Sequence, residues 1–184
     1  MLRSELGKQL NLKIAHIDQG RPNRPGTLLW PKFITVHNTD NTRAGAGAAN
    51  HDRFVRNTGH YVHNGRKVWI SWHYTVDDRE IYRHLPLNEI GWHAGTRDGN
   101  MRSIGVEVCM NSDGDQAGAF ARATKLLACL TFDMGMEPTE ALRTHWHWTG
   151  KTCPRLLLDA GKPGPRWQAF VDGVQALKDS LEPG

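Results

Sequence analysis

The stretch Phe33-Ile34-Thr35-Val36 decides the fold class. Its β-branched and aromatic side chains favour a β-strand, because such residues pack well on a pleated surface. Its run of apolar residues predicts burial on both faces, which is typical of a central strand. A second stretch, Ser103-Ile104-Gly105-Val106-Glu107-Val108-Cys109, has the same character. We therefore expect two buried strands, the second with one charged residue in its middle.

Weaker signals on either side of the first strand predict further sheet structure. Residues 62–75 contain the turn sequence His63-Asn64-Gly65 between loosely alternating segments, which predicts a hairpin. Residues 72–77 and 80–84 predict another strand pair around a turn. Residues 11–32 predict an ordered leader, because prolines restrict its backbone and apolar residues anchor it.

Three segments have helical patterns. Residues 117–134 carry apolar residues at spacings of three and four, and Gly135 fits the end of that helix. Residues 167–181 predict a second amphipathic helix, and residues 44–57 a helix with a poorly defined apolar side. Strands interspersed with helices predict an α/β fold in which a mixed central β-sheet is flanked by helices.

The composition indicates one soluble domain that spans residues 1–184. The chain is 39% hydrophobic and 23% charged, which argues against disorder, and no apolar run approaches the ~20 residues of a membrane span. The N-terminus shows no signal peptide, which predicts synthesis in the cytoplasm.

A net charge of +4 favours binding to anionic polymers in general, but the basic residues are scattered along the sequence, which argues against nucleic acid as the partner. Three cysteines are too few for a disulfide framework, whereas ten histidines and seven tryptophans indicate a binding cleft and are compatible with a metal site.

The segment from His145 to Pro154 (HWHWTGKTCP) is expected to form a loop and places imidazole, amine and thiol groups close together. Zinc prefers nitrogen and thiolate donors, and His145 and Cys153 lie eight residues apart, which allows both to reach one ion. His37, at the end of the first strand, is the natural third donor. Three donors with an open fourth position would make a catalytic site. Two alternatives remain: ordinary surface residues, or a structural site completed by a further histidine (His73, His93 or His147).

Glu107 is unusual because it lies among apolar residues of a predicted buried strand. Strand alternation could turn its side chain to solvent. If the side chain faces a metal-activated water, it becomes a general base. Lys151 could stabilise an oxyanion beside the metal, although most lysines of this kind are solvated loop residues.

Most of these residues lie within motifs that resemble one known family, the type 2 N-acetylmuramoyl-L-alanine amidases, and His145 lies eight residues before the cysteine of the last motif. These are zinc peptidoglycan amidases related to peptidoglycan recognition proteins, and the chain is most similar to their phage endolysin and autolysin branch. The motifs occur in the family's order from about residue 20 to residue 157. They are Asn23–Gly26, Ile34–Thr39, Ser71–Asp78, Leu85–Glu89, Trp92–Gly95, Ser103–Glu107 and Thr149–Pro154.

The resemblance implies a peptidoglycan recognition protein-like amidase fold and a role for each matching residue. His37, His145 and Cys153 match the ligands of one zinc ion, Glu107 the catalytic carboxylate and Lys151 the lysine beside the site. We expect a further set of residues to line the substrate groove: Trp72, Trp92 and His93. Some relatives use a tyrosine near position 72, but the tryptophan there favours the glutamate version of the mechanism.

The resemblance also implies an activity and a partner. The expected reaction is hydrolysis of the amide bond between N-acetylmuramic acid and L-alanine in bacterial peptidoglycan. The expected protein is a monomer without nucleic-acid or membrane partners or a separate wall-binding domain, and it acts on the cell wall in phage lysis or after non-classical secretion. A non-catalytic peptidoglycan-binding module is the main alternative, although such modules commonly lack the cysteine ligand that is present here.

Overall fold

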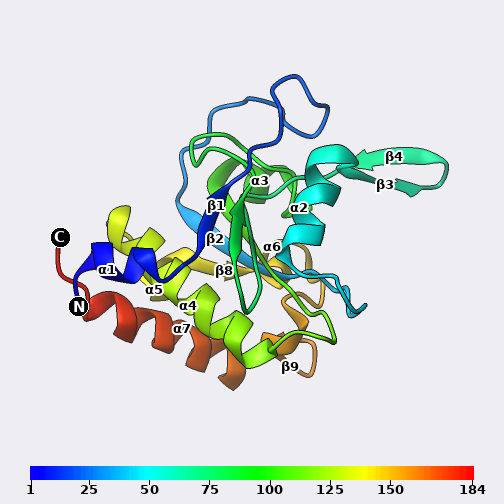
Figure 1. Cartoon of the computed structure of the whole chain (residues 1–184). Coiled ribbons are helices and arrows are strands. Elements are labelled where there is room, and N and C mark those ends of the chain that lie inside the picture. Colours follow the sequence, from blue (N-terminus) through cyan, green and yellow to red (C-terminus); the bar gives the residue numbers. More distant parts are fainter.

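A six-stranded mixed sheet organises the molecule, which a computed structural model describes over residues 1–184 (Figure 1). The strand order is β1-β6-β5-β7-β2-β8, and all neighbours are parallel except β5 and β6. The strands of this sheet are β1 (Leu12–Ile14), β2 (Phe33–Asn38), β5 (Tyr74–Val76), β6 (Ile81–Arg83), β7 (Ser103–Val108) and β8 (Leu142–Thr144). The expected α/β fold with a mixed central sheet is thereby confirmed.

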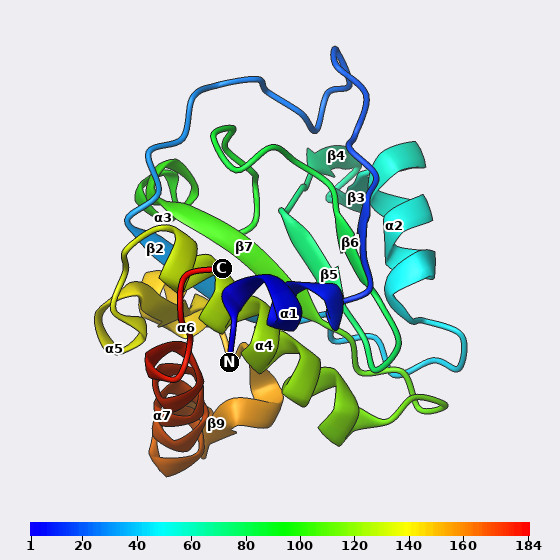
Figure 2. The same cartoon turned by 60° about the vertical axis from the view of Figure 1, so that its left-hand side comes forward.

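Helices cover both faces of this sheet. The helices are α1 (Arg3–Lys8), α2 (Ala48–Asn57), α3 (Arg97–Arg102), α4 (Gln116–Asp133), α5 (Pro138–Ala141), α6 (His145–Thr149) and α7 (Pro165–Asp179), with a 3-10 turn at Arg155–Leu157. On one face α1, α4 and α7 lie side by side, with both chain termini next to them (Figure 2). None of the helices combines the length and hydropathy that crossing a bilayer requires.

The main core lies between the sheet and α4 with α7. Alternate residues of the two central strands point into it, among them Ile34 and Val36 of β2 and Ile104 and Val106 of β7, all fully buried. The residues between them point to the opposite face and are polar or small. This division leaves the second face of the central strands free for chemistry.

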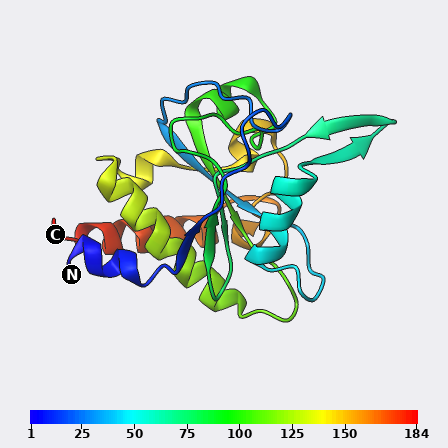
Figure 3. The ribbon, with the colours of Figure 1, turned by 45° about the horizontal axis from the view of Figure 1, so that its top comes forward.

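Two short hairpins complete the fold. β3 (His60–His63) and β4 (Arg66–Trp69) form an antiparallel ribbon that projects from the body (Figure 3). Its turn residues Asn64 and Gly65 both have positive φ, of 48° and 73°, as the expected tight turn requires. The second hairpin pairs β9 (Leu158–Asp159) with β10 (Lys162–Pro163).

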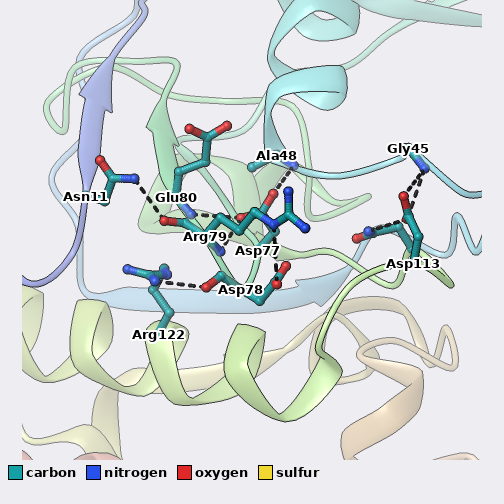
Figure 4. A network of polar contacts seen from close by, with 10 residues as sticks. Asn11, Gly45, Ala48, Asp77, Asp78, Arg79, Glu80, Asp113 and Arg122 are labelled. Carbon is teal, nitrogen blue, oxygen red and sulfur yellow. Dashed lines mark hydrogen bonds and ion pairs between the residues drawn. The ribbon is translucent and has the colours of Figure 1, made fainter.

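Asp77 ties α2 to the turn between β5 and β6 (Figure 4). Its Oδ2 accepts a hydrogen bond from the Ala48 amide at 2.8 Å, and its Oδ1 accepts bonds from the amides of Arg79 and Glu80 at 2.8 Å. The carboxylate thus satisfies an otherwise unpaired donor at the start of α2. This contact fixes the helix that leads into the projecting hairpin.

The expected strands and long helices are present with shifted boundaries. The helix expected over residues 44–57 begins at Ala48, because Gly45 has a φ of 78° and Gly47 is extended. The hairpin expected over residues 62–75 occupies 60–69. The leader of residues 11–32 is ordered, but its first residues form the unexpected edge strand β1. The stretch after His145, expected as a loop, begins with α6.

Candidate active site

The register of the two central strands brings together the first two residues of the site. His37 of β2 and Glu107 of β7 are direct partners across the parallel pair. Register partners on adjacent strands point to the same face of the sheet, so both side chains lie opposite the α4 face. Glu107 therefore does not face open solvent, the alternative that the sequence allows.

His145 and Cys153 reach this face from the strand next to β2. β8 pairs with β2 and leads directly into α6, whose first residue is His145. Gly150 ends α6 with a φ of 75°, and the following loop folds back so that the Cys153 carbonyl accepts a hydrogen bond from the Trp146 amide at 3.0 Å. The return of the chain places the thiol beside the imidazoles.

The three side chains converge as a metal site requires. His37 Nδ1 lies 3.1 Å from His145 Nδ1 and 3.7 Å from Cys153 Sγ, and all three donors are within 4.8 Å of one another. Bond lengths of about 2.1 Å to nitrogen and 2.3 Å to sulfur in a tetrahedral shell predict separations of about 3.4 and 3.6 Å. The three buried residues therefore fit a divalent cation that prefers nitrogen and sulfur donors.

Burial keeps these donors uncharged. It lowers the pKa of His37 well below its ordinary value, helped by the neighbouring His93, His145 and Lys151. Burial together with Lys151 lowers the pKa of His145 to about 4. Burial, with the nearby Glu107, raises the pKa of the Cys153 thiol to about 12. Neutral imidazoles are ready to bind a metal, and the thiol releases its proton when it does so.

Glu107 carries a carboxylate oxygen without a partner. Its side chain is half-buried, and Oε2 is buried with no hydrogen bond. Burial raises the pKa of Glu107 to about 7, against the opposing effect of Lys151. An unsatisfied buried group costs about 1–3 kcal/mol of stability, and such perturbed carboxyl groups concentrate at functional sites.

A cavity of about 650 Å³ opens over this cluster. Every expected site residue except Cys153 lines it: His37, Trp72, Trp92, His93, Glu107, His145 and Lys151. Trp72 is only 5% exposed and packs with Val55 and Leu85 in a small secondary core, so it offers little surface to a ligand. Lys151 is exposed at the rim.

His93 contacts His37 as well as the cavity. His93 Nδ1 lies 3.1 Å from His37 Nε2, and His93 Nε2 lies 3.2 Å from the Ser103 carbonyl oxygen. The carbonyl only accepts hydrogen bonds, so His93 carries its proton on Nε2 and accepts from His37 at Nδ1. His37 is thereby protonated on Nε2, which leaves its Nδ1 lone pair facing His145 and Cys153.

Gly105 makes room for this arrangement. A Cβ at Gly105 would lie 2.7 Å from the His93 ring, so a side chain there would displace the ring. The Gly105 amide also donates a hydrogen bond to His73 Nδ1 at 3.0 Å. The glycine of the Ile-Gly-Val-Glu motif thus places His93 behind His37.

The three histidines considered as a fourth donor do not complete a four-residue shell. Both ring nitrogens of His73 are engaged, by the Gly105 amide and the Glu89 carbonyl, and those of His93 by His37 and Ser103. His147 is exposed and lines a different cavity, beside Trp146 and Trp167. None of them therefore adds a fourth donor to His37, His145 and Cys153, and three protein donors is the number typical of catalytic zinc sites.

Sequence reasoning missed several cavity residues. Tyr61 and Trp69 come from the projecting hairpin, and Arg97 and Asn100 from α3. Arg97 and Asn100 closely follow the Trp92–Gly95 motif, which was the available signal. The sequence of the hairpin gave no such signal, because only the folded position of the ribbon brings its residues to the cavity.

Comparisons with known proteins agree with this site. Residues 26–156 match the family model described as N-acetylmuramoyl-L-alanine amidase. The N-acetylmuramoyl-L-alanine amidases XlyA and CwlH of Bacillus subtilis strain 168 are 46% and 41% identical over 160 and 170 residues, or 86% and 91% of this chain. The solved catalytic domain of XlyA is 44% identical with a TM-score of 0.78, covering 90% of this chain and 99% of that one.

The chain is shorter than these curated relatives. The matches span 49% of XlyA and 62% of CwlH. Residues 26–156, which match the family model, contain every strand of the sheet except β1 and all the residues that line the cavity.

Proposed function

The chain belongs to the N-acetylmuramoyl-L-alanine amidase family, and from this membership we propose that it hydrolyses the amide bond between N-acetylmuramic acid and L-alanine in bacterial peptidoglycan. Residues 1–184 act as one catalytic domain, as a monomer, and the site of action is the cell wall. The proposal agrees with the donor cluster, the unpartnered carboxylate and the cavity that contains both.

The residues divide the reaction between them. A single zinc ion held by His37, His145 and Cys153 would supply Lewis-acid polarisation of the scissile carbonyl and lower the pKa of the attacking water. Glu107 accepts the proton of that water and returns it to the departing amine of L-alanine. Lys151, at the rim of the same cavity, offers its ammonium group to the oxyanion of the tetrahedral intermediate.

One observation favours an enzyme over a peptidoglycan receptor. Glu107 Oε2 is buried, lacks a hydrogen-bond partner and lies on the strand position opposite His37. An unpaired buried carboxyl group destabilises the fold, and such groups with a perturbed pKa concentrate at catalytic sites. A general base needs a site of this kind.

The proposed activity predicts that purified peptidoglycan releases stem peptides with a free L-alanine amino terminus. Release should stop after dialysis against a chelator and return when zinc is added, since the proposed water activation needs the cation. Mass spectrometry of the soluble products measures this. Binding to peptidoglycan without any peptide release from the zinc-loaded protein would identify a receptor and overturn the proposal.

The His93 hydrogen bonds predict a positioning effect on the metal. We expect His93→Ala to weaken zinc affinity by about 10–100-fold, the usual effect of removing a partner behind a ligating histidine. His93→Gln, which can both accept and donate, should recover part of the loss. Chelator competition measures the affinity, independently of catalysis. Equal zinc affinity in folded His93→Ala and the parent protein would remove His93 from this role.

A further inference from the structure

The excess positive charge of the protein is concentrated in one segment. The chain has 23 Lys and Arg against 19 Asp and Glu, yet residues 53–76 contain four basic residues and no acidic one. The rest of the chain therefore carries 19 residues of each sign. Although basic residues occur along the whole sequence, the net charge belongs to the end of α2 and to the β3–β4 hairpin.

Within this segment the hairpin carries two of the three basic residues that form no ion pair, and the third, Arg53, lies on α2. Arg56 forms an ion pair with Asp52 at 2.7 Å on α2. Arg66 and Lys67 of β4 are exposed and take part in none of the ion pairs of the structure. The ribbon that holds them projects from the body of the protein (Figure 3).

One face of the hairpin continues the wall of the active-site cavity. Tyr61 and Val68 are register partners, and both line the cavity that contains Glu107. The next pair on the same face is His63 with Arg66, so the basic side chain lies further out along the same surface. Tyr61 is 50% exposed, which leaves an aromatic ring between the cavity and Arg66.

The root of the hairpin is firmly held. The side-chain amide of Asn23 donates hydrogen bonds to the carbonyls of Val55 at 2.8 Å and Ile70 at 3.2 Å, which joins α2 to the end of the hairpin. Gly59 has a φ of 60°, and a Cβ there would lie 2.1 Å from the Asn23 amide. The ribbon is therefore fixed beside the cavity, in a position to bind a ligand that extends out of it.

We propose that the β3–β4 hairpin is an arm that binds the carboxylates of peptidoglycan stem peptides beyond the unit that reacts at Glu107. This inference rests on the proposed function. A cavity of about 650 Å³ holds only a small part of a polymer, so the remainder passes over its walls. Arg66 offers a planar fork that fits carboxylates, and Tyr61 supplies an apolar contact on the same face. Lys67 lies on the other face of the ribbon, 5.7 Å from the centre of the Trp69 ring, and adds charge to the arm.

The test compares the double variant Arg66→Ser/Lys67→Ser with the parent protein on two substrates. One is insoluble peptidoglycan freed of phosphate-containing wall polymers, and the other is a short soluble muramoyl peptide. We expect kcat/KM on the insoluble polymer to fall about 3- to 10-fold at low salt, and activity on the short substrate to remain unchanged. In 1 M salt the difference should vanish, because the screening length falls to about 3 Å.

A second pair of substitutions controls for net charge. Arg43 and Lys162 are exposed and form no ion pair, so Arg43→Ser/Lys162→Ser removes the same charge elsewhere. This variant should behave as the parent does. Equal losses in the two double variants would show that net charge alone acts, and would overturn the proposal. So would an equal loss on both substrates, or no loss on either.

Sedimentation with peptidoglycan separates failure of the arm from failure of the proposed activity. The parent protein should co-sediment better than the hairpin variant whether or not it cleaves the polymer. If this difference is seen only when the phosphate-containing polymers are left on the wall, the arm binds phosphate rather than carboxylate and the proposal is wrong. If the parent binds through the arm but releases no peptide, the proposed activity fails and the arm does not.

Discussion

Replacing Glu107 by glutamine is expected to lower the rate of peptide release by about 10²–10⁴-fold, the usual contribution of a general base. The substitution keeps the shape of the side chain and removes its ability to accept a proton from water. Glu107 is the register partner of His37 but is not one of the three metal donors, so zinc should remain bound. Kinetics of stem-peptide release, together with elemental analysis of the same sample, measure both quantities.

The same variant provides a control for folding, because the buried carboxyl group affects stability in a pH-dependent way. Burial raises the pKa of Glu107 from an ordinary 4.5 to about 7 in the folded protein, a shift equivalent to about 3 kcal/mol. Between these pH values the folded state binds more protons than the unfolded state, so stability falls as the pH rises and the loss is complete above pH 7.

The metal-free Glu107→Gln variant does not lose stability in this way, because glutamine does not ionise. It should therefore unfold at a higher denaturant concentration than the metal-free parent at pH 8, and at a similar concentration near pH 4. Full peptide-release activity in a folded, zinc-loaded Glu107→Gln variant would remove Glu107 from the mechanism. Loss of zinc from the variant would instead assign the carboxylate to the metal shell.

Replacing His37 by alanine is expected to abolish both stoichiometric zinc binding and activity. The imidazole supplies one of only three protein donors, and its Nδ1 lies 3.1 Å from His145 Nδ1 and 3.7 Å from Cys153 Sγ. Two remaining donors form a much weaker site, and the proposed reaction needs the cation. Elemental analysis after zinc loading and gel filtration measures the metal content.

His147→Ala is the matched control. His147 lies on α6, two residues after His145, but is exposed and lines a separate cavity. Its loss should leave zinc content and peptide release close to those of the parent. A folded His37→Ala variant that still binds one zinc per chain would show that the three side chains do not form the metal site.

The central strands could be predicted because their sequence signal is strong. Phe33–Val36 and Ser103–Cys109 are rich in β-branched and apolar residues, and both lie in interior strands of the sheet. The edge strands β1 and β8 escaped prediction because each has three residues and pairs in parallel with a strand distant in the sequence. The equally short β5 and β6 could be predicted because a turn joins them directly. Helix α6 was expected as a loop because it is short and rich in tryptophan and histidine.

The metal donors could be predicted from residue chemistry and from the family resemblance, and the structure brings them together. The hydrogen bond between His93 and His37 could not be predicted, because it depends on the close approach of the His93 ring to Gly105 on β7. The role of the hairpin in the cavity wall was equally hidden. Asn64-Gly65 indicates a turn but not where the ribbon will point.

The parallel register of β2 and β7 has a consequence for how such a protein can evolve. Backbone hydrogen bonds set the spacing of His37 and Glu107, so an insertion of one residue within either strand would rotate one of them to the opposite face. The long connection between these strands carries the projecting ribbon and can change in length without this penalty. Mutation can therefore remodel the parts that contact the polymer while the reacting pair is inherited intact.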